Sequence, residues 1–119
     1  QRNLYVGITE VEAARIRTEL KNKYGMFVYK GILSEDYAIA PKSTWADFVF
    51  SRNYNLKPLK EVESFIAENE HLPDVPSAAQ VAEEGYSQHD MNKVLLQKIE
   101  ELTLYIIKQQ KEIEELKTR

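Results

Sequence analysis

The last thirty residues, Asp90 to Arg119, read DMNKVLLQKIEELTLYIIKQQKEIEELKTR. Apolar residues recur there at alternating steps of three and four, and no Gly or Pro interrupts the pattern. The heptad positions a and d hold Asn92, Leu95, Ile99, Leu102, Ile106, Gln109, Ile113 and Leu116. This spacing predicts one long helix whose a/d seam pairs with other helices in a coiled coil. An amphipathic helix packed on its own domain is the alternative.

The strength of this seam can be bounded from its side chains. Each of its six apolar residues contributes roughly 1.5–3 kcal/mol on full burial. The sum is about 9–18 kcal/mol per chain, an upper bound because an unfolded chain already buries some area. Association costs on the order of 4–15 kcal/mol. The seam alone is therefore marginal, and we expect the preceding segment to join the interface.

The flanking heptad positions favour a parallel arrangement. Glu112 at g can meet Lys117 at e of a neighbouring parallel helix. Met91 at g and Leu96 at e widen the apolar face, which suits more than two strands or packing against the preceding domain. By contrast, Ile at a with Leu at d favours two strands. Gln109 is a polar d layer, better suited to fixing register than to adding stability. The heptads leave dimer and trimer open.

Bulk composition excludes several classes of protein. The chain has 119 residues, a net charge of −3 and no basic block, so no nucleic-acid footprint is expected. It contains no cysteine, which excludes disulfides and thiolate metal sites. His71 and His89 are far apart and lack metal-ligand spacing, so we predict no metal and no cofactor. No apolar run approaches a membrane span. Because the first residue is Gln1 rather than methionine, we expect a fragment.

The first fifty residues read mainly as strands. Short apolar runs at 4–8, 26–29 and 37–40 are bounded by Gly or Pro. Residues 14–21 alternate apolar with charged side chains, which favours a strand. A helix competes there, because Thr9 and Glu12 could form a capping box. The aromatic-rich run 45–50 is expected to anchor the small sheet to the helical middle of the chain.

Helical signals dominate that middle part. Pro58 can begin a helix that runs to about Glu70, and 71–76 reads as a rigid, proline-containing, extended linker. Ser77 and Gln80 predict a capping box for a short helix that Gly85 ends. We therefore predict an α+β chain with three parts. These are a β-rich end at 1–50, a helical collar with the linker at 51–89, and the coiled-coil helix at 90–119, which begins near Ser87 or Asp90.

Several segments, taken in order, resemble a C-terminal module of surface and tail-fibre-like proteins of Bacteroidetes. They are WADFVF at 45–50, YNLKPL at 54–59, EVESFI at 61–66, HLP at 71–73, VPSA at 75–78, MN at 91–92, LL at 95–96 and KIEELTLY at 98–105. The likeness covers about residues 25–115. This module is similar to the intramolecular chaperone domain of phage tail spikes and endosialidases.

The resemblance implies a homotrimer, with a dimer as the runner-up. In it the C-terminal helices bring three chains into register so that upstream β structure can fold. It also implies an extracellular, cell-surface or virion location, with the chain itself and its upstream domains as partners, and no nucleic acid or membrane insertion.

Two alternatives remain open at this point. The phage family often cleaves itself with a serine and a nearby lysine, and the comparable residues are Ser51 and Lys57. The motif departs from the family pattern: Arg52 replaces an aspartate, Asn55 stands where arginine is expected, and one residue is inserted. The second alternative is an adhesin tip that binds glycan or a receptor through the aromatics of the first half, which would otherwise serve as core or subunit interface.

Overall fold

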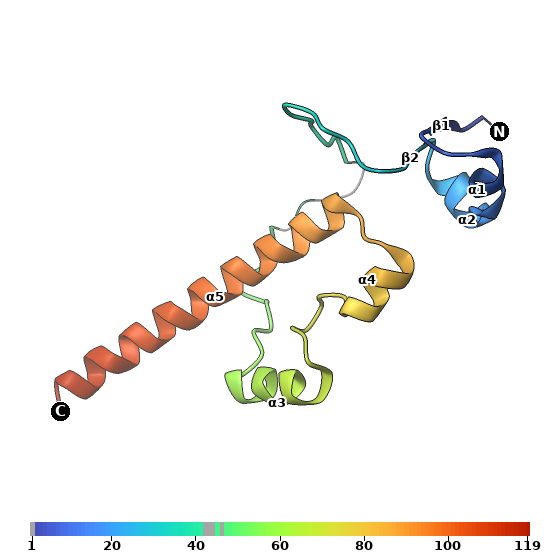
Figure 1. The fold of residues 1–119 in the computed structure, drawn as a ribbon. Coiled ribbons are helices and arrows are strands. Elements are labelled where there is room, and N and C mark those ends of the chain that lie inside the picture. Colours follow the sequence, from blue (N-terminus) through green and yellow to red (C-terminus); the bar gives the residue numbers. More distant parts are fainter. Residues whose placement is uncertain (1, 42–44, 46) are drawn as a thin grey trace. The chain divides into compact units, whose positions relative to one another are not determined.

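A computed structural model describes residues 2–41, 45 and 47–119. The chain divides into two compact units, Gln1–Ala38 and Ile39–Arg119 (Figure 1). Ala46, part of the aromatic run, lies outside the described residues.

The first unit is a small sheet whose two strands are joined by a pair of short helices. Strand β1 (Leu4–Val6) pairs with β2 (Met26–Val28) in parallel, Leu4 opposite Met26. Parallel strands need a crossover connection, and helices α1 (Glu10–Arg15) and α2 (Thr18–Lys23) supply it. The Asn3 amide donates to two carbonyls, those of Lys21 and Tyr24, and so ties the start of β1 to the end of α2.

The strand prediction for residues 14–21 is wrong, because the capping box and the helical spacing prevail there. The Thr9 hydroxyl accepts from the Glu12 amide at 3.2 Å, and the Glu12 carboxylate accepts from the Thr9 amide at 2.9 Å. Ala13, Ile16 and Leu20 are partly buried, whereas the intervening residues 14, 15 and 17–19 are exposed. Their steps of three and four place them on one side of the crossover. The alternation at 14–21 therefore does not reflect a strand. It arises by chance where the end of α1 and the start of α2 follow each other.

A further correction concerns residues 37–40, which form no strand. Tyr37 and Ile39 are exposed, at 65% and 42%. Alternating apolar residues make a stable strand only where a partner strand and a core face are available. The described part of the chain supplies neither to this segment, so the predicted β-rich end is a pair of three-residue strands.

Helices of the second unit begin and end close to the predicted residues. Helix α3 (Leu59–Asn69) follows Pro58 and ends at Glu70, which adopts the left-handed conformation at φ 60°. Helix α4 (Ala78–Glu84) has the Ser77–Gln80 capping box and ends at Gly85. The segment between them is a turn rather than an extended linker. The Val75 amide donates to the Leu72 carbonyl at 3.2 Å, and Asp74 has φ 69°. Proline before a residue of positive φ is typical of a type II turn.

Helix α5 (Gln88–Lys117) is the thirty-residue helix that the heptads predict. Ser87 is its N-cap, and its hydroxyl accepts from the Asp90 amide at 3.2 Å. The helix continues without interruption to its C-cap at Thr118 (Figure 1).

The single chain buries very little apolar surface. Among the described residues, Val49 and Pro73 alone are buried. The accessible surface is 10340 Å². Two separate globular proteins of the sizes of these units would together expose only about 7,900 Å² by the usual scaling of surface with mass. The excess is surface that a partner could cover.

Replacing Ser87 with alanine removes the N-cap of α5. We expect Ser87→Ala to lower the free energy of unfolding by about 0.5–2 kcal/mol, measured by urea titration followed by circular dichroism. Ser87→Asp is the matched control, because aspartate also caps and favours the helix dipole. Equal losses in both variants would contradict the capping role.

Candidate functional site

One face of α5 is fastened to the collar, residues 51–89, by a partly buried charge cluster. The Lys98 ammonium lies 3.0 Å from the Asp74 carboxylate and 3.0 Å from the Glu101 carboxylate. The side chains of Lys98 and Glu101 are only 12% and 14% exposed. Asp74 reaches α5 from the turn that follows α3. Asp74 has a left-handed backbone in that turn, and this conformation positions its carboxylate toward Lys98.

Tyrosines extend this cluster along the helix. The Tyr54 hydroxyl donates a hydrogen bond to Glu101 and accepts one from the Gln97 side-chain amide at 3.1 Å. One turn further, the Tyr105 hydroxyl donates to the Lys57 carbonyl at 2.6 Å. Four contacts therefore hold the collar to a single stripe of α5 that runs from residue 97 to residue 105.

The cluster moves three pKa values upward. Partial burial lowers the pKa of Lys98, but hydrogen bonds and charge attraction from Glu101 and Asp74 outweigh it and leave that pKa above its usual value. Burial and then the hydrogen bond to Glu101 raise the pKa of Tyr54. Burial and then the negative charge of Glu101 raise the pKa of Tyr105. The folded protein therefore holds these protons more tightly than the unfolded chain does.

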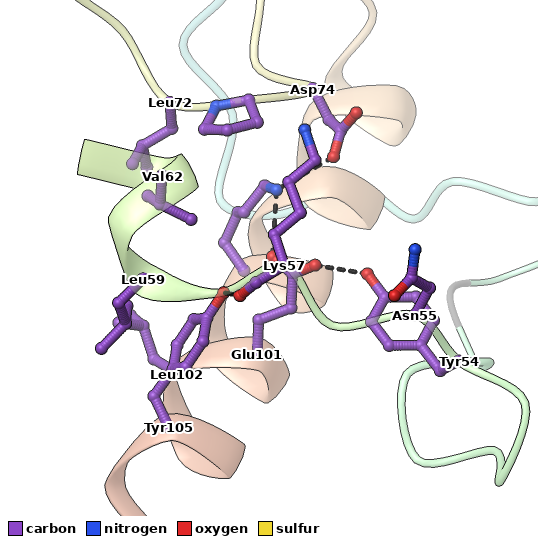
Figure 2. Close-up of a pocket in the computed structure, with 12 residues that line it drawn as sticks. Tyr54, Asn55, Lys57, Leu59, Val62, Leu72, Asp74, Glu101, Leu102 and Tyr105 are labelled. Atoms are coloured by element: carbon purple, nitrogen blue, oxygen red, sulfur yellow. Dashed lines mark hydrogen bonds and ion pairs between the residues drawn. The ribbon is translucent and has the colours of Figure 1, made fainter. Parts of the chain in front are cut away.

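An apolar cleft of about 220 Å³ lies beside the cluster, between α3 and α5. Figure 2 shows Leu59, Val62 and Leu72 on its collar side and Leu102 and Tyr105 on its α5 side. Leu59 and Leu72 are 46% and 44% exposed, so the cleft opens to solvent along an apolar rim. Leu102 belongs to both the cleft and the a/d seam.

The predicted a/d seam is exposed in the single chain. Its six apolar side chains keep between 46% and 64% of their surface accessible: Leu95, Ile99, Leu102, Ile106, Ile113 and Leu116. The polar seam residues Asn92 and Gln109 are exposed as well. At 100° per residue, the seam is centred about 110° round the helix from the stripe that holds the collar. The collar therefore leaves the seam free.

Beyond the collar, the end of α5 is not covered by any residue that the structure describes. Every residue from Ile106 to Arg119 is exposed. An isolated helix of this length is marginal in water, since most helical stability in proteins comes from packing an apolar face. Ile106, Ile113 and Leu116 provide such a face but have no cover.

The self-cleavage candidates are not brought together by any contact among the described residues. The Ser51 hydroxyl accepts from the Asn53 amide at 3.4 Å, within its own turn. The Lys57 ammonium lies 5.6 Å from the centre of the Phe65 ring. Both residues are exposed. A serine nucleophile needs a base within hydrogen-bond reach, and the geometry gives Ser51 none, so cleavage stays an unsupported prediction.

The aromatics of the first half are largely on the surface rather than in a core. Tyr37 is 65% and Trp45 51% exposed. Tyr5 stacks on Phe27 across the two strands, with ring centroids 5.6 Å apart. Trp45 lies 5.9 Å from the ring of His89, within the second unit. The adhesin alternative stays a prediction.

No cluster able to hold a metal ion occurs among the described residues. His71 instead packs edge-on against Phe65, with centroids 5.4 Å apart. The search of those same residues also finds no helix with the length and apolar character that a membrane crossing requires.

The sequence did not reveal the charge cluster. Tyr54, Asp74 and Lys98 are distant in the chain, and no local spacing joins them. The pair at 73–74 was a usable signal, because Pro followed by Asp is typical of a turn. What that turn presents to α5 depends on tertiary packing alone.

Comparisons with known proteins identify no relative. No family model matches the chain, and neither the curated proteins nor the solved structures give a significant match.

The raised pKa values predict a loss of stability in alkali. Because folding raises the pKa of Lys98, Tyr54 and Tyr105, their contribution is fully present below the pKa values of the unfolded chain, about 10 for both residue types. It is lost as the pH rises through the folded pKa values. We expect the free energy of unfolding of the second unit to be flat near neutral pH and to fall above about pH 10. Fluorescence of the single tryptophan, followed in urea at each pH and one protein concentration, measures it.

The double variant Lys98→Met with Tyr54→Phe should lose part of this alkaline slope. It should also be less stable at neutral pH by about 1.5–3 kcal/mol, the usual value of a hydrogen bond to a charged group. Tyr24→Phe, at an exposed tyrosine of the first unit, is the control and should keep the wild-type profile. An unchanged slope in the double variant would show that other groups cause the alkaline loss.

Proposed function

We propose that this chain is a non-enzymatic assembly module that joins copies of a fibrous surface or tail-fibre-like protein through α5. Three parallel helices pack along the a/d seam, and the collar braces each one from outside. The single observation that carries this proposal is the exposure of all six apolar seam residues while another stripe of the same helix is occupied.

The projecting end of α5 supports the same proposal. Residues 106–119 are exposed on every side, yet their helix keeps a heptad pattern to Leu116. A solitary surface helix has no need for a continuous apolar stripe. A coiled coil uses one, since each a or d side chain inserts between four residues of the facing helix.

Three copies rather than two are proposed on the width of the apolar face. Met91 at g and Leu96 at e are both partly buried in the single chain, and they extend the seam sideways at the helix start. A wider face suits an interface with two neighbours. The family resemblance points in the same direction.

The proposed consequence for upstream structure is entropic. Aligning chains at one end raises the effective concentration of the segments that precede them, so strand pairing between subunits requires less loss of chain entropy. In this way a C-terminal bundle acts as an intramolecular chaperone without catalysing any reaction.

Charges placed in the seam should abolish assembly. By light scattering after size exclusion, we expect the wild-type chain to have three times the 13.9 kDa mass of one chain. We expect the double variant Ile99→Asp with Ile106→Asp to have the mass of a single chain. Two buried, unpaired carboxylates per chain would cost more than such a seam supplies. Lys108→Asp with Lys111→Asp is the control, since it places two aspartates on the same helix outside a and d. An assembly that survives in the seam variant, or a wild-type monomer at all concentrations, would refute the proposal.

Gln109 should lower the stability of the assembly but hold the helices in a single register. Gln109→Leu replaces the polar d layer with an apolar one, so we expect a higher melting temperature of the assembly at fixed protein concentration. The same variant should populate more than one mass or register, which native mass spectrometry can resolve. Lys111→Leu, at position f outside the seam and its flanks, is the control. A lower melting temperature for Gln109→Leu would argue that Gln109 does not lie in the seam.

A further inference from the structure

The a/d seam leaves one exposed apolar side chain of α5 without a role. Ile107 is 47% exposed, and it occupies position b, outside a and d. The rim of the cleft between α3 and α5 is also apolar and open, at Leu59 and Leu72. These are two uncovered apolar surfaces on opposite flanks of one helix.

The two surfaces cannot cover each other within one chain. The collar is fastened to positions c and g of α5, through Glu101, Lys98 and Tyr105. Position b lies about 120° away round the helix, at 100° per residue. Ile107 therefore points away from the collar of its own chain.

We infer that the cleft of one chain receives Ile107 from the α5 of the next copy in the assembly, so that each collar holds two helices. This inference rests on the proposed function, since it requires parallel helices in register. In such a bundle the d/g flank of one helix faces the a/e flank of its neighbour. The collar contacts positions c and g, so it lies on one side of the groove between the two helices. Position b of the neighbouring helix lies on the other side of that groove.

The two surfaces also lie at matching heights along the bundle. The Tyr105 hydroxyl bonds to the Lys57 carbonyl at 2.6 Å, so the start of α3, with Leu59, lies beside the level of Tyr105. In a bundle in register, Ile107 of the neighbouring copy lies only about 3 Å further along the axis than Tyr105, at 1.5 Å per residue. Leu102 makes the cleft continuous with the seam, because it lines both.

The charges at this junction are compatible with close approach. Position g of one helix meets position e of the following heptad in its parallel neighbour, which places Thr103 opposite Lys98 and Gln110 opposite Tyr105. Both approaching residues are neutral. Lys98 already has two carboxylate partners in its own chain, Asp74 and Glu101. At the level of Tyr105, where the cleft would receive Ile107, the neighbour therefore brings no charge; one heptad earlier, beside Lys98, its position b holds Glu100.

Cysteine pairing between chains tests the contact, since the native chain contains no cysteine. One chain carries Leu59→Cys and a second, with a different tag, carries Ile107→Cys. They are unfolded together, refolded and mildly oxidised. We expect a covalent dimer of unlike chains, at least tenfold more abundant than for the pair Leu59→Cys with Glu114→Cys. Glu114 is the matched control, because it also lies at position b but about 10.5 Å further along the helix, beyond the reach of a disulfide.

A third chain, Ile106→Cys, separates this inference from the proposed function. Its a-position cysteines should crosslink to each other in any parallel bundle in register. If Ile106→Cys crosslinks but Leu59→Cys pairs no better with Ile107→Cys than with Glu114→Cys, the inference is overturned and the assembly stands. If Ile106→Cys also fails, the proposed function falls with it.

A second measurement avoids any change to the collar. Ile107→Ser in the otherwise native chain should raise the concentration at which the assembly dissociates at least threefold, with Lys108→Ser as the control. An unchanged dissociation concentration for Ile107→Ser would overturn the inference even if Leu59→Cys failed to fold.

Discussion

The ion pair between Lys98 and Glu101, with Asp74 as the second carboxylate, determines which way α5 faces. Apolar contacts are non-directional, so a helix held only by them could rotate on its collar. The Lys98 ammonium and the Glu101 carboxylate are mostly covered, so leaving either group without its partner there costs free energy. The cluster therefore fixes the rotation of α5 and, with it, the direction of the exposed seam.

This arrangement assigns the two kinds of interaction to different faces of one helix. The polar cluster acts within the chain, where Tyr54, Asp74 and Lys98 can find one another at no cost in association entropy. The apolar seam residues remain exposed, and the proposed assembly would use them for contact between chains, where non-directional burial tolerates small misfits. Such a division favours a chain that reaches its own local structure first and then associates.

Sequence reasoning succeeded where the information is local. Capping residues at Ser77 and Ser87 and the heptads of α5 act within a few residues, and helices α4 and α5 were predicted from them. Helix α3 was predicted from Pro58. It failed at residues 14–21, where a period of two and a period of 3.6 fit nearly the same letters. The charge cluster could not be predicted, because no local pattern in the sequence indicates which turn packs on which stripe of a helix. The heptads do indicate which face of α5 the collar leaves exposed, and that face is the one proposed for assembly.

Both units of the chain share one deficiency, which is a shortage of neighbours. The parallel pair of β1 and β2 has only three residues in each strand, and Leu4 and Met26 at its start are 57% and 52% exposed. Parallel strands occur almost only where both sheet faces are covered. The seam of α5 lacks cover in the same sense. Under the proposed assembly, the sheet and the long helix would both gain cover by association, and that gain would favour copies that meet in register.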